Sequence, residues 1–334
     1  MFSFDVIAGK AVKEVLDASA TEVVDLVEDA YLRHDAGRTL NPDSYFLRFP
    51  AKPDSRIIAL PAFIELPKAE IAGIKWIASF PGNVADDIPR ASAVLVLNDY
   101  ATGYPIALLE AASISAVRTA ASAAVAARAI ARHVPADGEV AIIGAGVIAR
   151  TILRYLAATS YPISKLRVHD LHADSAASLI RFANEDVGIP ARAAGSLDDA
   201  LAAQTVITAT TALEPYIAQQ LRPGQVALNV SLRDFAPEVV LGAQNYFDDV
   251  EHCMKANTSP HLAEQATGGR DFVTGTIADV LQGKQLPDAG RGVLFSPFGL
   301  GVLDLAVGHF VLDRAREQGL ALEVADFFGE TRRW

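Results

Sequence analysis

Short apolar segments alternate with longer helical segments through the middle of the chain. Residues 139–143, 166–170, 205–210, 226–230 and 246–250 are mostly apolar and bounded by turn residues, which is typical of buried strands. Helical spacing of apolar residues lies between them. A regular alternation of strand and helix requires a parallel sheet with helices on both faces. We therefore predict an α/β fold built on a doubly wound parallel sheet.

The segment before this sheet has a different pattern. Helical spacing of apolar residues covers 12–16 and 22–32, with Thr21 as a candidate helix N-cap. Three β-rich stretches bounded by Pro, Gly or Asn follow, at residues 56–60, 71–80 and 93–97. They indicate a separate α+β unit.

Two long helices connect these parts. Residues 114–133 are alanine-rich and lead into the first parallel strand, and residues 302–318 have helical spacing near the C-terminus. We expect this last helix to return to the first unit. The prediction is a discontinuous α+β substrate domain, residues 1–125 and 298–334, and a nucleotide-binding domain, residues 126–297.

The turn after the first parallel strand carries a dinucleotide fingerprint. Residues 144–149, Gly-Ala-Gly-Val-Ile-Ala, join that strand to a helix, as the G-x-G-x-x-A motif of a Rossmann fold requires. Gly144 permits a tight turn, Gly146 leaves room for a pyrophosphate, and Ala149 allows helix and strand to pack closely. The free N–H groups at the helix start face the phosphates. An ordinary glycine-rich turn is the alternative.

Asp170 ends the next predicted strand, about where a carboxylate binds a ribose hydroxyl. Such a carboxylate would repel a 2′-phosphate, so the sequence predicts NAD rather than NADP as the cofactor. His169 and His172 beside it keep NADP open as the alternative.

Composition restricts the class of protein and its partners. The 334 residues suffice for about two domains; 51% of them are hydrophobic, and the net charge is −11. We expect no binding to nucleic acid or to an anionic membrane, and no secretory signal or membrane-spanning run is recognised. Cys253 is the single cysteine, which excludes an intrachain disulfide and predicts a cytoplasmic protein.

Four charged side chains stand in apolar or small-residue surroundings. Lys75 lies in a strand-like run, Arg118 among small helix residues and Arg48 between two apolar residues. Asp234 follows strand 226–230, at the sheet edge where α/β folds bind ligands, and a carboxylate there can transfer protons. The structural alternatives are solvent-facing charges for Lys75 and Arg48, a surface ion pair for Arg118 and a loop or N-cap carboxylate for Asp234.

His252 and His261 lie on either side of a loop. Without a second Cys/His pair at ligand spacing, we expect no metal site. A helix cap formed by Thr258 or Ser259 is the favoured explanation of the polar residues in this loop.

Taken together, these segments resemble the ornithine cyclodeaminase/mu-crystallin family along nearly the whole chain. The matching pieces are residues 73–83 (GIKWIASFPGN), 103–105, 115–121 (SAVRTAA), 144–149, Asp234 and 297–305 (PFGLGVLDL). The resemblance implies a Rossmann domain that binds NAD and a discontinuous substrate and dimerisation domain. It further implies a homodimeric oxidoreductase whose substrate is a small amino acid.

The resemblance also implies roles for individual residues. Lys75 and Arg118 would hold substrate carboxylates, with Arg48, Asn83 and Arg90 as further substrate-binding candidates. Asp234 would act as the base, and Lys75 would share in the proton transfer. The expected cofactor contacts are Thr119, Gly144, Ala145, Gly146, Val147, Ile148, Asp170, Thr210, Ser231 and Gly299.

Within the family, residues 56–62, 90–93, 231–234 and 258–265 look like one branch. Its members oxidise N-(2-amino-2-carboxyethyl)-L-glutamate, a compound with several carboxylates, in 2,3-diaminopropionate biosynthesis for siderophores or peptide antibiotics. Cyclodeaminases carry a glutamate where this chain has Ile58, and its absence removes the counter-charge for the side-chain amine of ornithine. The alternatives are an ornithine cyclodeaminase, a ketimine or imine reductase, and a non-catalytic, crystallin-like nucleotide-binding protein.

Overall fold

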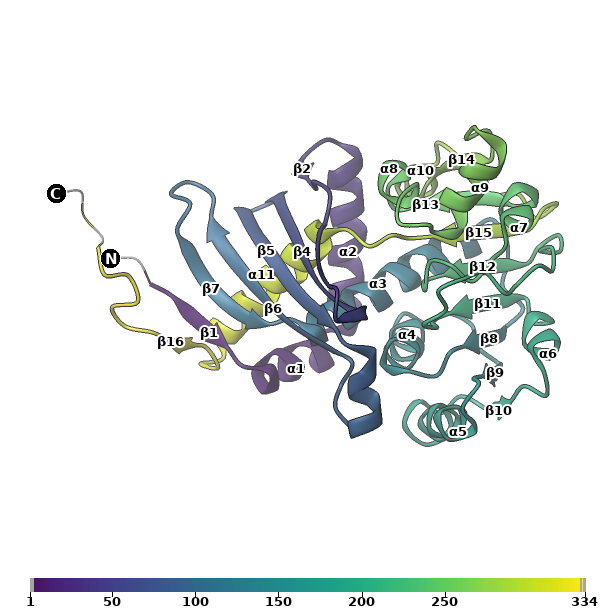
Figure 1. The fold of residues 1–334 in the computed structure, drawn as a ribbon, viewed down its shortest axis with the longest axis horizontal. Helices are drawn as coiled ribbons and strands as arrows, with labels where there is room; N and C mark the ends of the chain where they lie inside the picture. The colour runs from purple at the N-terminus through teal and green to yellow at the C-terminus, as the bar shows by residue number, and fades with distance from the viewer. Residues whose placement is uncertain (1–2, 331, 333–334) are drawn as a thin grey trace. The chain divides into compact units, whose positions relative to one another are not determined.

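The chain forms two compact units. The computed structural model describes residues 3–330 and residue 332. Unit 1 is Met1–Arg118 with Leu300–Trp334, and unit 2 is Thr119–Gly299. The boundaries that we predicted lie at 125/126 and 297/298, so the observed first boundary falls seven residues earlier, inside helix α3 (Ala112–Ala131). Figure 1 shows the elements of each unit.

Unit 1 is built on an eight-stranded sheet. Its order is β16-β1-β7-β6-β5-β4-β2, with β3 paired to β4, and the β1–β7 pair is parallel while the others are antiparallel. The strands are β1 (Asp5–Ile7), β2 (Thr39–Leu40), β3 (Tyr45–Phe49), β4 (Lys52–Leu66), β5 (Ala69–Ser79), β6 (Ala91–Asp99), β7 (Pro105–Glu110) and β16 (Leu322–Glu323). The long β4–β5–β6 ladder carries the predicted site residue Lys75 at its centre.

Helix α11 (Gly301–Glu317) packs on one face of this sheet (Figure 1). A Cβ on Gly73 would lie 2.3 Å from the carbonyl oxygen of Val96 and 2.8 Å from Leu305, so glycine permits this close approach. The other helical segments of unit 1 are α1 (Gly9–Ala18), α2 (Ala20–Asp35) and the 3₁₀ segment η1 (Pro81–Asp86). Helix α11 thus belongs to unit 1 although it follows unit 2 in the chain.

Unit 2 contains an eight-stranded parallel sheet of order β10-β9-β8-β11-β12-β15-β13-β14. The strands are β8 (Glu139–Ile143), β9 (Lys165–His169), β10 (Ala191–Ala193), β11 (Thr205–Thr208), β12 (Val226–Asn229), β13 (Gln244–Phe247), β14 (Val273–Thr276) and β15 (Val293–Ser296). The strand order reverses at β8, between β9 and β11, so ligands are expected at the carboxyl ends of β8 and β11. The prediction of a Rossmann-type parallel sheet is confirmed.

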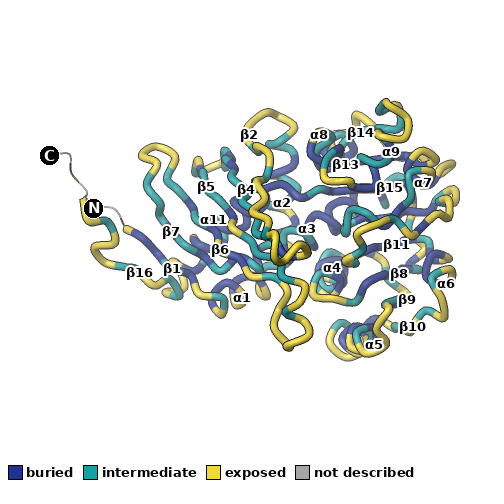
Figure 2. The backbone as a smooth tube through the Cα atoms, in the orientation of Figure 1, coloured by how far each residue is buried: buried dark blue, intermediate teal, exposed yellow. Residues whose placement is uncertain are grey.

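The helical segments of unit 2 connect these strands. They are the later part of α3, α4 (Val147–Ala158), α5 (Ala173–Phe182), η2 (Ala183–Val187), α6 (Leu197–Leu201), α7 (Pro237–Gly242), α8 (Val250–Cys253), α9 (Ser259–Thr267) and α10 (Ile277–Leu281). Helix α3 is long and apolar enough to pass as a membrane span, yet 67% of its most apolar window is buried in the protein. Figure 2 shows this burial along α3, so its composition is explained as that of a core helix.

Several predicted elements differ from the observed ones. Predicted strand 56–60 is only the middle of β4, and β3, β7 and β15 were not predicted. The N-cap prediction for Thr21 is wrong, because α2 begins directly after Ser19, where α1 and α2 adjoin, and it has no side-chain cap. The cap prediction for Thr258 is confirmed: its hydroxyl accepts the His261 N–H at 3.2 Å.

Candidate active site

The glycine turn between β8 and α4 has the geometry that a dinucleotide requires. Gly144 has a φ of +89°, and a Cβ there would lie 2.4 Å from the carbonyl oxygen of Ala209, so this position needs glycine. A Cβ on Gly146 would meet no atom within 4 Å, which leaves its surface open to a pyrophosphate. Gly146 precedes α4 without a side-chain cap, so the first N–H groups of α4 can bind phosphate oxygens.

Asp170 lies directly after β9 and is hydrogen-bonded to the glycine turn. Its carboxylate accepts the N–H of Ala145 at 2.7 Å and the N–H of His172 at 2.8 Å. Val147 is exposed and Ile148 is half-buried. An acidic side chain thus stands beside the turn at the carboxyl edge of the sheet, where a ribose-binding carboxylate is expected. These residues fit a bound dinucleotide.

Asp234 follows β12 and is fully buried. Its Oδ1 accepts hydrogen bonds from Thr210 Oγ1 at 2.6 Å and from the Tyr216 hydroxyl at 2.9 Å, and its Oδ2 accepts one from Ser231 Oγ at 2.5 Å. Three neutral hydroxyls therefore replace water as the hydrogen-bond donors to this buried carboxylate. Burial and the charge of Asp234 raise the pKa of Tyr216 well above its usual value, so this phenol stays protonated and donates.

The remaining predicted cofactor contacts lie in different surroundings. The side-chain hydroxyls of Thr210 and Ser231 both donate hydrogen bonds to the Asp234 carboxylate. Gly299 has a φ of +93°, and its N–H donates to Asp248 Oδ2 at 2.7 Å. Thr119 is half-buried on α3.

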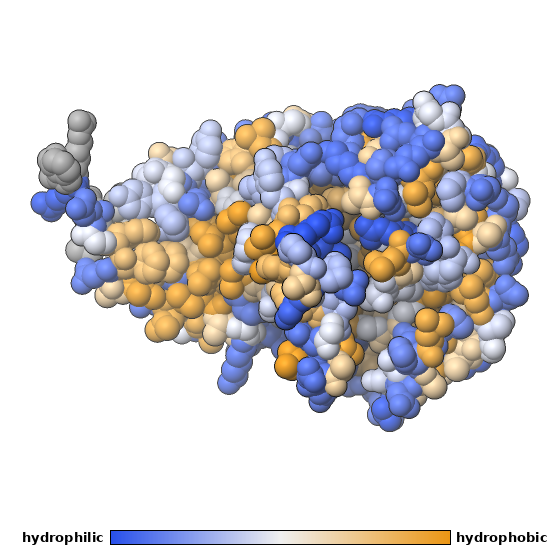
Figure 3. All heavy atoms as spheres, viewed as in Figure 1, coloured by the Kyte–Doolittle hydropathy of each residue, from blue (hydrophilic) through white to orange (hydrophobic). Residues whose placement is uncertain are grey.

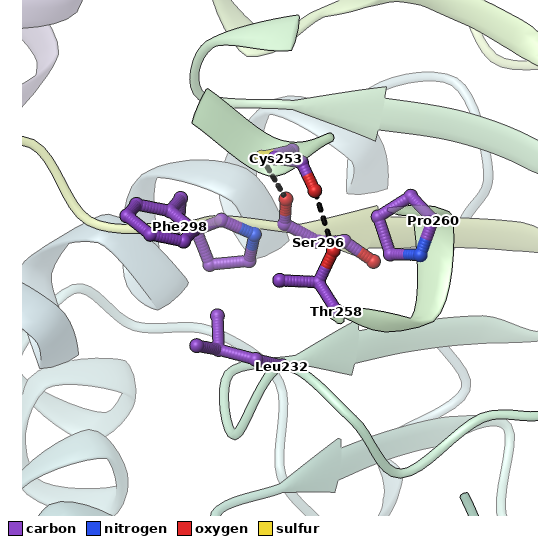
Figure 4. Close-up of a pocket in the computed structure, with 7 residues that line it drawn as sticks. Leu232, Cys253, Thr258, Pro260, Ser296 and Phe298 are labelled. Atoms are coloured by element: carbon purple, nitrogen blue, oxygen red, sulfur yellow. Dashed lines mark hydrogen bonds between the residues drawn. The ribbon is translucent and has the colours of Figure 1, made fainter. Parts of the chain in front are cut away.

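Asp248 and Cys253 organise the segment that ends unit 2. Asp248 Oδ1 accepts the Phe298 N–H at 2.8 Å and the Cys253 thiol at 3.2 Å, while Cys253 also contacts the Ser296 carbonyl, as Figure 4 shows. Burial, with the charge of Asp248, raises the pKa of the Cys253 thiol well above its usual value. This cysteine is a structural residue, because a buried thiol of high pKa is a poor nucleophile.

Lys75, Arg118 and Asp304 meet in the interior of unit 1. Lys75 Nζ donates to Asp304 Oδ2 at 2.7 Å and to Ser115 Oγ at 3.1 Å, and Arg118 Nε donates to Asp304 Oδ1 at 3.3 Å. Lys75 is 1% exposed and Asp304 is 0% exposed. Strand β5, helix α3 and helix α11 each supply one member, so the group exists only because α11 packs on the sheet. We call Lys75, Arg118 and Asp304 the cationic cluster.

The cationic cluster has one more positive than negative charge when Lys75 is protonated. Burial lowers the pKa of Lys75 to about 8, although the neighbouring Asp304 opposes this shift. At neutral pH, Lys75 is therefore mostly an ammonium group. Its third N–H and the two terminal nitrogens of Arg118 have no hydrogen-bond partner within residues 3–330. Such a group can bind a carboxylate, for which ammonium and guanidinium are the usual partners.

Three predicted substrate-binding residues are not joined to the cationic cluster by any hydrogen bond or ion pair of the described chain. Arg48 is exposed on β3, with its guanidinium carbon 5.2 Å from the centre of the Phe46 ring. Asn83 donates from Nδ2 to the Pro89 carbonyl at 3.2 Å, which stabilises the η1 turn. Arg90 is exposed, and its carbonyl accepts the Phe80 N–H at 2.9 Å.

Sequence reasoning missed Asp304 and Tyr216 as site residues. Asp304 lies in the apolar run Val302–Val307 of α11 and was part of the matching segment 297–305. A buried acid in such a run needs a positive partner, and this signal could have found it. Tyr216 lies in an irregular loop after β11 that carries no comparable signal.

The chain is similar to several NAD(P)-dependent enzymes. The N-((2S)-2-amino-2-carboxyethyl)-L-glutamate dehydrogenase of Staphylococcus aureus is 29% identical over 89% of this chain and 91% of that protein. The Thermococcus litoralis Δ1-pyrroline-2-carboxylate reductase, solved with NADH and L-proline, has a TM-score of 0.87 at 25% identity, covering 96% of this chain and all of that one. An archaeal alanine dehydrogenase dimer with NAD has a TM-score of 0.86 at 23% identity, over 98% of this chain and all of that one, and shows the shared fold.

These relatives are dehydrogenases and reductases, and the fit of the glycine turn to a dinucleotide agrees with them. The prediction of an NAD-dependent oxidoreductase is confirmed. The model of the ornithine cyclodeaminase/mu-crystallin family matches residues 6–319. The chain therefore belongs to the ornithine cyclodeaminase/mu-crystallin family.

Proposed function

We propose that this protein converts N-(2-amino-2-carboxyethyl)-L-glutamate, NAD and water to 2-oxoglutarate, L-2,3-diaminopropionate, NADH and a proton. The S. aureus relative that carries this activity in its name spans nearly the whole chain. The observation that carries the proposal is the cationic cluster, a buried group of net positive charge with unused donors. The product would serve a siderophore or peptide natural-product pathway.

The charge of the cationic cluster fits an anionic substrate. The proposed substrate has three carboxylates, and one of them would restore neutrality by binding Lys75 and the planar guanidinium of Arg118. We propose that Arg48, Asn83 and Arg90 bind the other carboxylates. Their positions on β3 and beside η1 leave the two arginines exposed and therefore accessible.

Ile58 supports an anionic substrate over ornithine. It pairs with Ile77 across β4 and β5, two residues along from the Leu60–Lys75 pair, so its side chain lies on the same sheet face as Lys75. The side chains at this position are apolar, and a second amine placed against them would lose its hydration without gaining a counter-charge. An ornithine cyclodeaminase needs a carboxylate there.

The chemistry divides between cofactor and protein. NAD, when bound, accepts the hydride from the α-carbon of the glutamate half. We propose that Asp234 takes up the proton of the secondary amine as the nitrogen lone pair forms the C=N bond. Water then adds to the imine carbon, and the C–N bond breaks as the nitrogen gains a proton. Lys75, with a pKa of about 8, can give or accept a proton near neutral pH.

The direct test is turnover with defined compounds. Enzyme, NAD and the adduct should yield NADH and 2-oxoglutarate in equal amounts, and ornithine should yield neither proline nor ammonia. Asp234→Asn should abolish turnover and leave NAD binding intact, whereas the exposed carboxylate variant Asp271→Asn should behave as wild type. Proline and ammonia from ornithine, without NADH from the adduct, would refute the proposed reaction.

Reduction of a cyclic imine is the second candidate. The T. litoralis reductase was solved with L-proline, which has one carboxylate, and the cationic cluster has the charge to bind one. NADH consumption with Δ1-pyrroline-2-carboxylate, without NADH formation from the adduct, would favour this reaction. NAD binding without turnover of any of these compounds would favour a crystallin-like role.

We also propose that the protein is a cytoplasmic homodimer. Hydrophobic side chains gather on the exposed surface of unit 1 (Figure 3). Trp76 and Val94 are 41% and 38% exposed and face each other across β5 and β6. A second copy covering them would remove this apolar surface from water. Sedimentation equilibrium should give a mass of two chains, and Trp76→Lys should shift it toward one.

A further inference from the structure

We infer that Tyr216 is a positioning residue for Asp234. The Tyr216 hydroxyl keeps the carboxylate ionised and oriented, and so sets the pH range in which this base works. The inference rests on the proposed function, because it takes Asp234 as the proton acceptor. It adds a residue with no assigned role and gives that residue a measurable effect.

The backbone fixes Tyr216 against Asp234 independently of the side chains. The N–H groups of Tyr216 and Ile217 donate to the Asp234 carbonyl at 3.1 Å and 2.9 Å. Ile217 and Phe235 form a parallel β-bridge and are both buried. The loop after β11 is thereby paired with the loop after β12, so the backbone of Tyr216 is held beside Asp234 and its phenol needs no loop movement to reach the carboxylate.

Tyr216 differs from the two other hydroxyl donors in chemistry and in exposure. A phenol, with an ordinary pKa of about 10, is more acidic than the hydroxyls of Thr210 and Ser231 and is the stronger donor to a carboxylate. Tyr216 is 40% exposed while Asp234 is 0% exposed. Tyr216 is thus the donor whose side chain reaches from the buried carboxylate to the surface of the loop.

Tyr216 is the titratable side chain seen to hydrogen-bond the Asp234 carboxylate within the described residues. The other charged or titratable groups on the segments packed here are Glu214, Arg233 and His261. Arg233 Nη2 donates to the Ala256 carbonyl at 2.7 Å, and His261 Nδ1 accepts the Asn257 N–H at 3.1 Å. We therefore expect the proton affinity of Asp234 to change when one of its hydroxyl donors is removed.

The test is the pH profile of kcat/KM for NADH formation from the adduct. Tyr216→Phe removes one donor to the charged form of Asp234, so the acidic limb should move upward by roughly one to two pH units. Tyr161→Phe is the matched control, because it removes a buried phenol of unit 2 whose hydroxyl lies 2.9 Å from Thr205 Oγ1 and not beside Asp234. This control should keep the wild-type limb.

Each outcome separates the inference from the proposed function. Loss of turnover in Asp234→Asn together with an unshifted limb in Tyr216→Phe would overturn the inference alone. An NAD affinity lowered by Tyr216→Phe with no shift of the limb would make Tyr216 a cofactor contact and would also overturn it. If Tyr216→Phe does not fold, 3-fluorotyrosine at position 216 decides in its place: it keeps the hydroxyl that bonds Oδ1 but is a more acidic donor, so the limb must move downward, and an unshifted limb would overturn the inference.

Discussion

Two fully buried carboxylates, one in each unit, are stabilised in opposite ways. Asp304 in unit 1 lies between the side chains of Lys75 and Arg118, so positive charge outweighs its own. Asp234 in unit 2 accepts hydrogen bonds from three neutral hydroxyls and from no cation of the described chain. A carboxylate cancelled by cations leaves a group suited to binding an anion, whereas one solvated by hydroxyls remains a proton acceptor. Under the proposed function, the same residue type would therefore support substrate binding in one unit and proton transfer in the other.

Of the changes that test this difference between the two carboxylates, removing the charge of Asp304 should have the largest effect, which is on the stability of the protein. Asp304→Asn leaves the buried Lys75 and the half-buried Arg118 without a counter-charge, which should lower the free energy of unfolding by about 3–5 kcal/mol. Urea denaturation measures this change. Asp313→Asn, on the same helix but with a half-exposed side chain, is the control and should stay close to wild type. Equal stability of the two variants would contradict the cationic cluster as a structural unit.

Alanine at the two glycines of the nucleotide turn should separate folding from cofactor binding. Gly144→Ala places an alanine at a positive φ, with its Cβ 2.4 Å from the Ala209 carbonyl oxygen. Unit 2 should therefore lose about 1–3 kcal/mol of stability. Gly146→Ala points into open space and should keep its stability while weakening NAD binding. Thermal melts and NAD titrations measure the two effects; the same loss of stability in both variants would refute the distinction.

Raising the pH should affect substrate binding through unit 1. Lys75 has a pKa lowered to about 8, so it loses its proton as the pH rises through this value, and the net charge of the cationic cluster falls to zero. KM for the adduct should then rise by up to about tenfold per pH unit above pH 8. Lys75→Arg keeps its charge in this range, and its profile shows what the ionisation of the substrate contributes. Parallel KM profiles of wild type and variant would contradict the assignment.

The smallest effect on stability is expected at Arg48. Arg48→Ala changes an exposed side chain whose contact is with the Phe46 ring, so unfolding should change by about 0.5 kcal/mol or less. If Arg48 binds a carboxylate, KM should rise several-fold while kcat stays the same. Lys68→Ala, which alters another exposed cation of unit 1, is the control. An unchanged KM in Arg48→Ala would remove this residue from the proposed substrate site.

Local signals in the sequence were sufficient for much of the fold. The strand 139–143 and the turn at Gly144 were placed correctly, because a buried run ending in a glycine of positive φ has few alternatives. Strand β15 was missed: three apolar residues and a serine without a glycine motif do not distinguish a strand from other buried segments. Thr21 failed as a cap because helix α1 ends directly before α2.

The partners of the site residues were harder to predict than the residues themselves. Lys75 stood out as a charge in an apolar strand, but its partner Asp304 lies 229 residues later in the sequence. No local spacing encodes that pairing, which depends on α11 packing on β5. Tyr216 reaches Asp234 through an irregular loop, whose path is set by backbone hydrogen bonds to the next loop. Contacts between residues far apart in the chain were therefore the part of the candidate site that could not be predicted from the sequence.

The discontinuity of unit 1 has a consequence for synthesis of the chain on the ribosome. The eighth and last strand of unit 2 ends at Ser296, before α11 begins at Gly301. All eight strands of unit 2 are therefore synthesised before Asp304, the counter-charge of Lys75. N-terminal domains generally fold first during synthesis, whereas unit 1 lacks helix α11 until the segment after unit 2 has been made. A released chain truncated after residue 299 would contain all eight strands of unit 2, whereas Lys75 in unit 1 would lack its counter-charge.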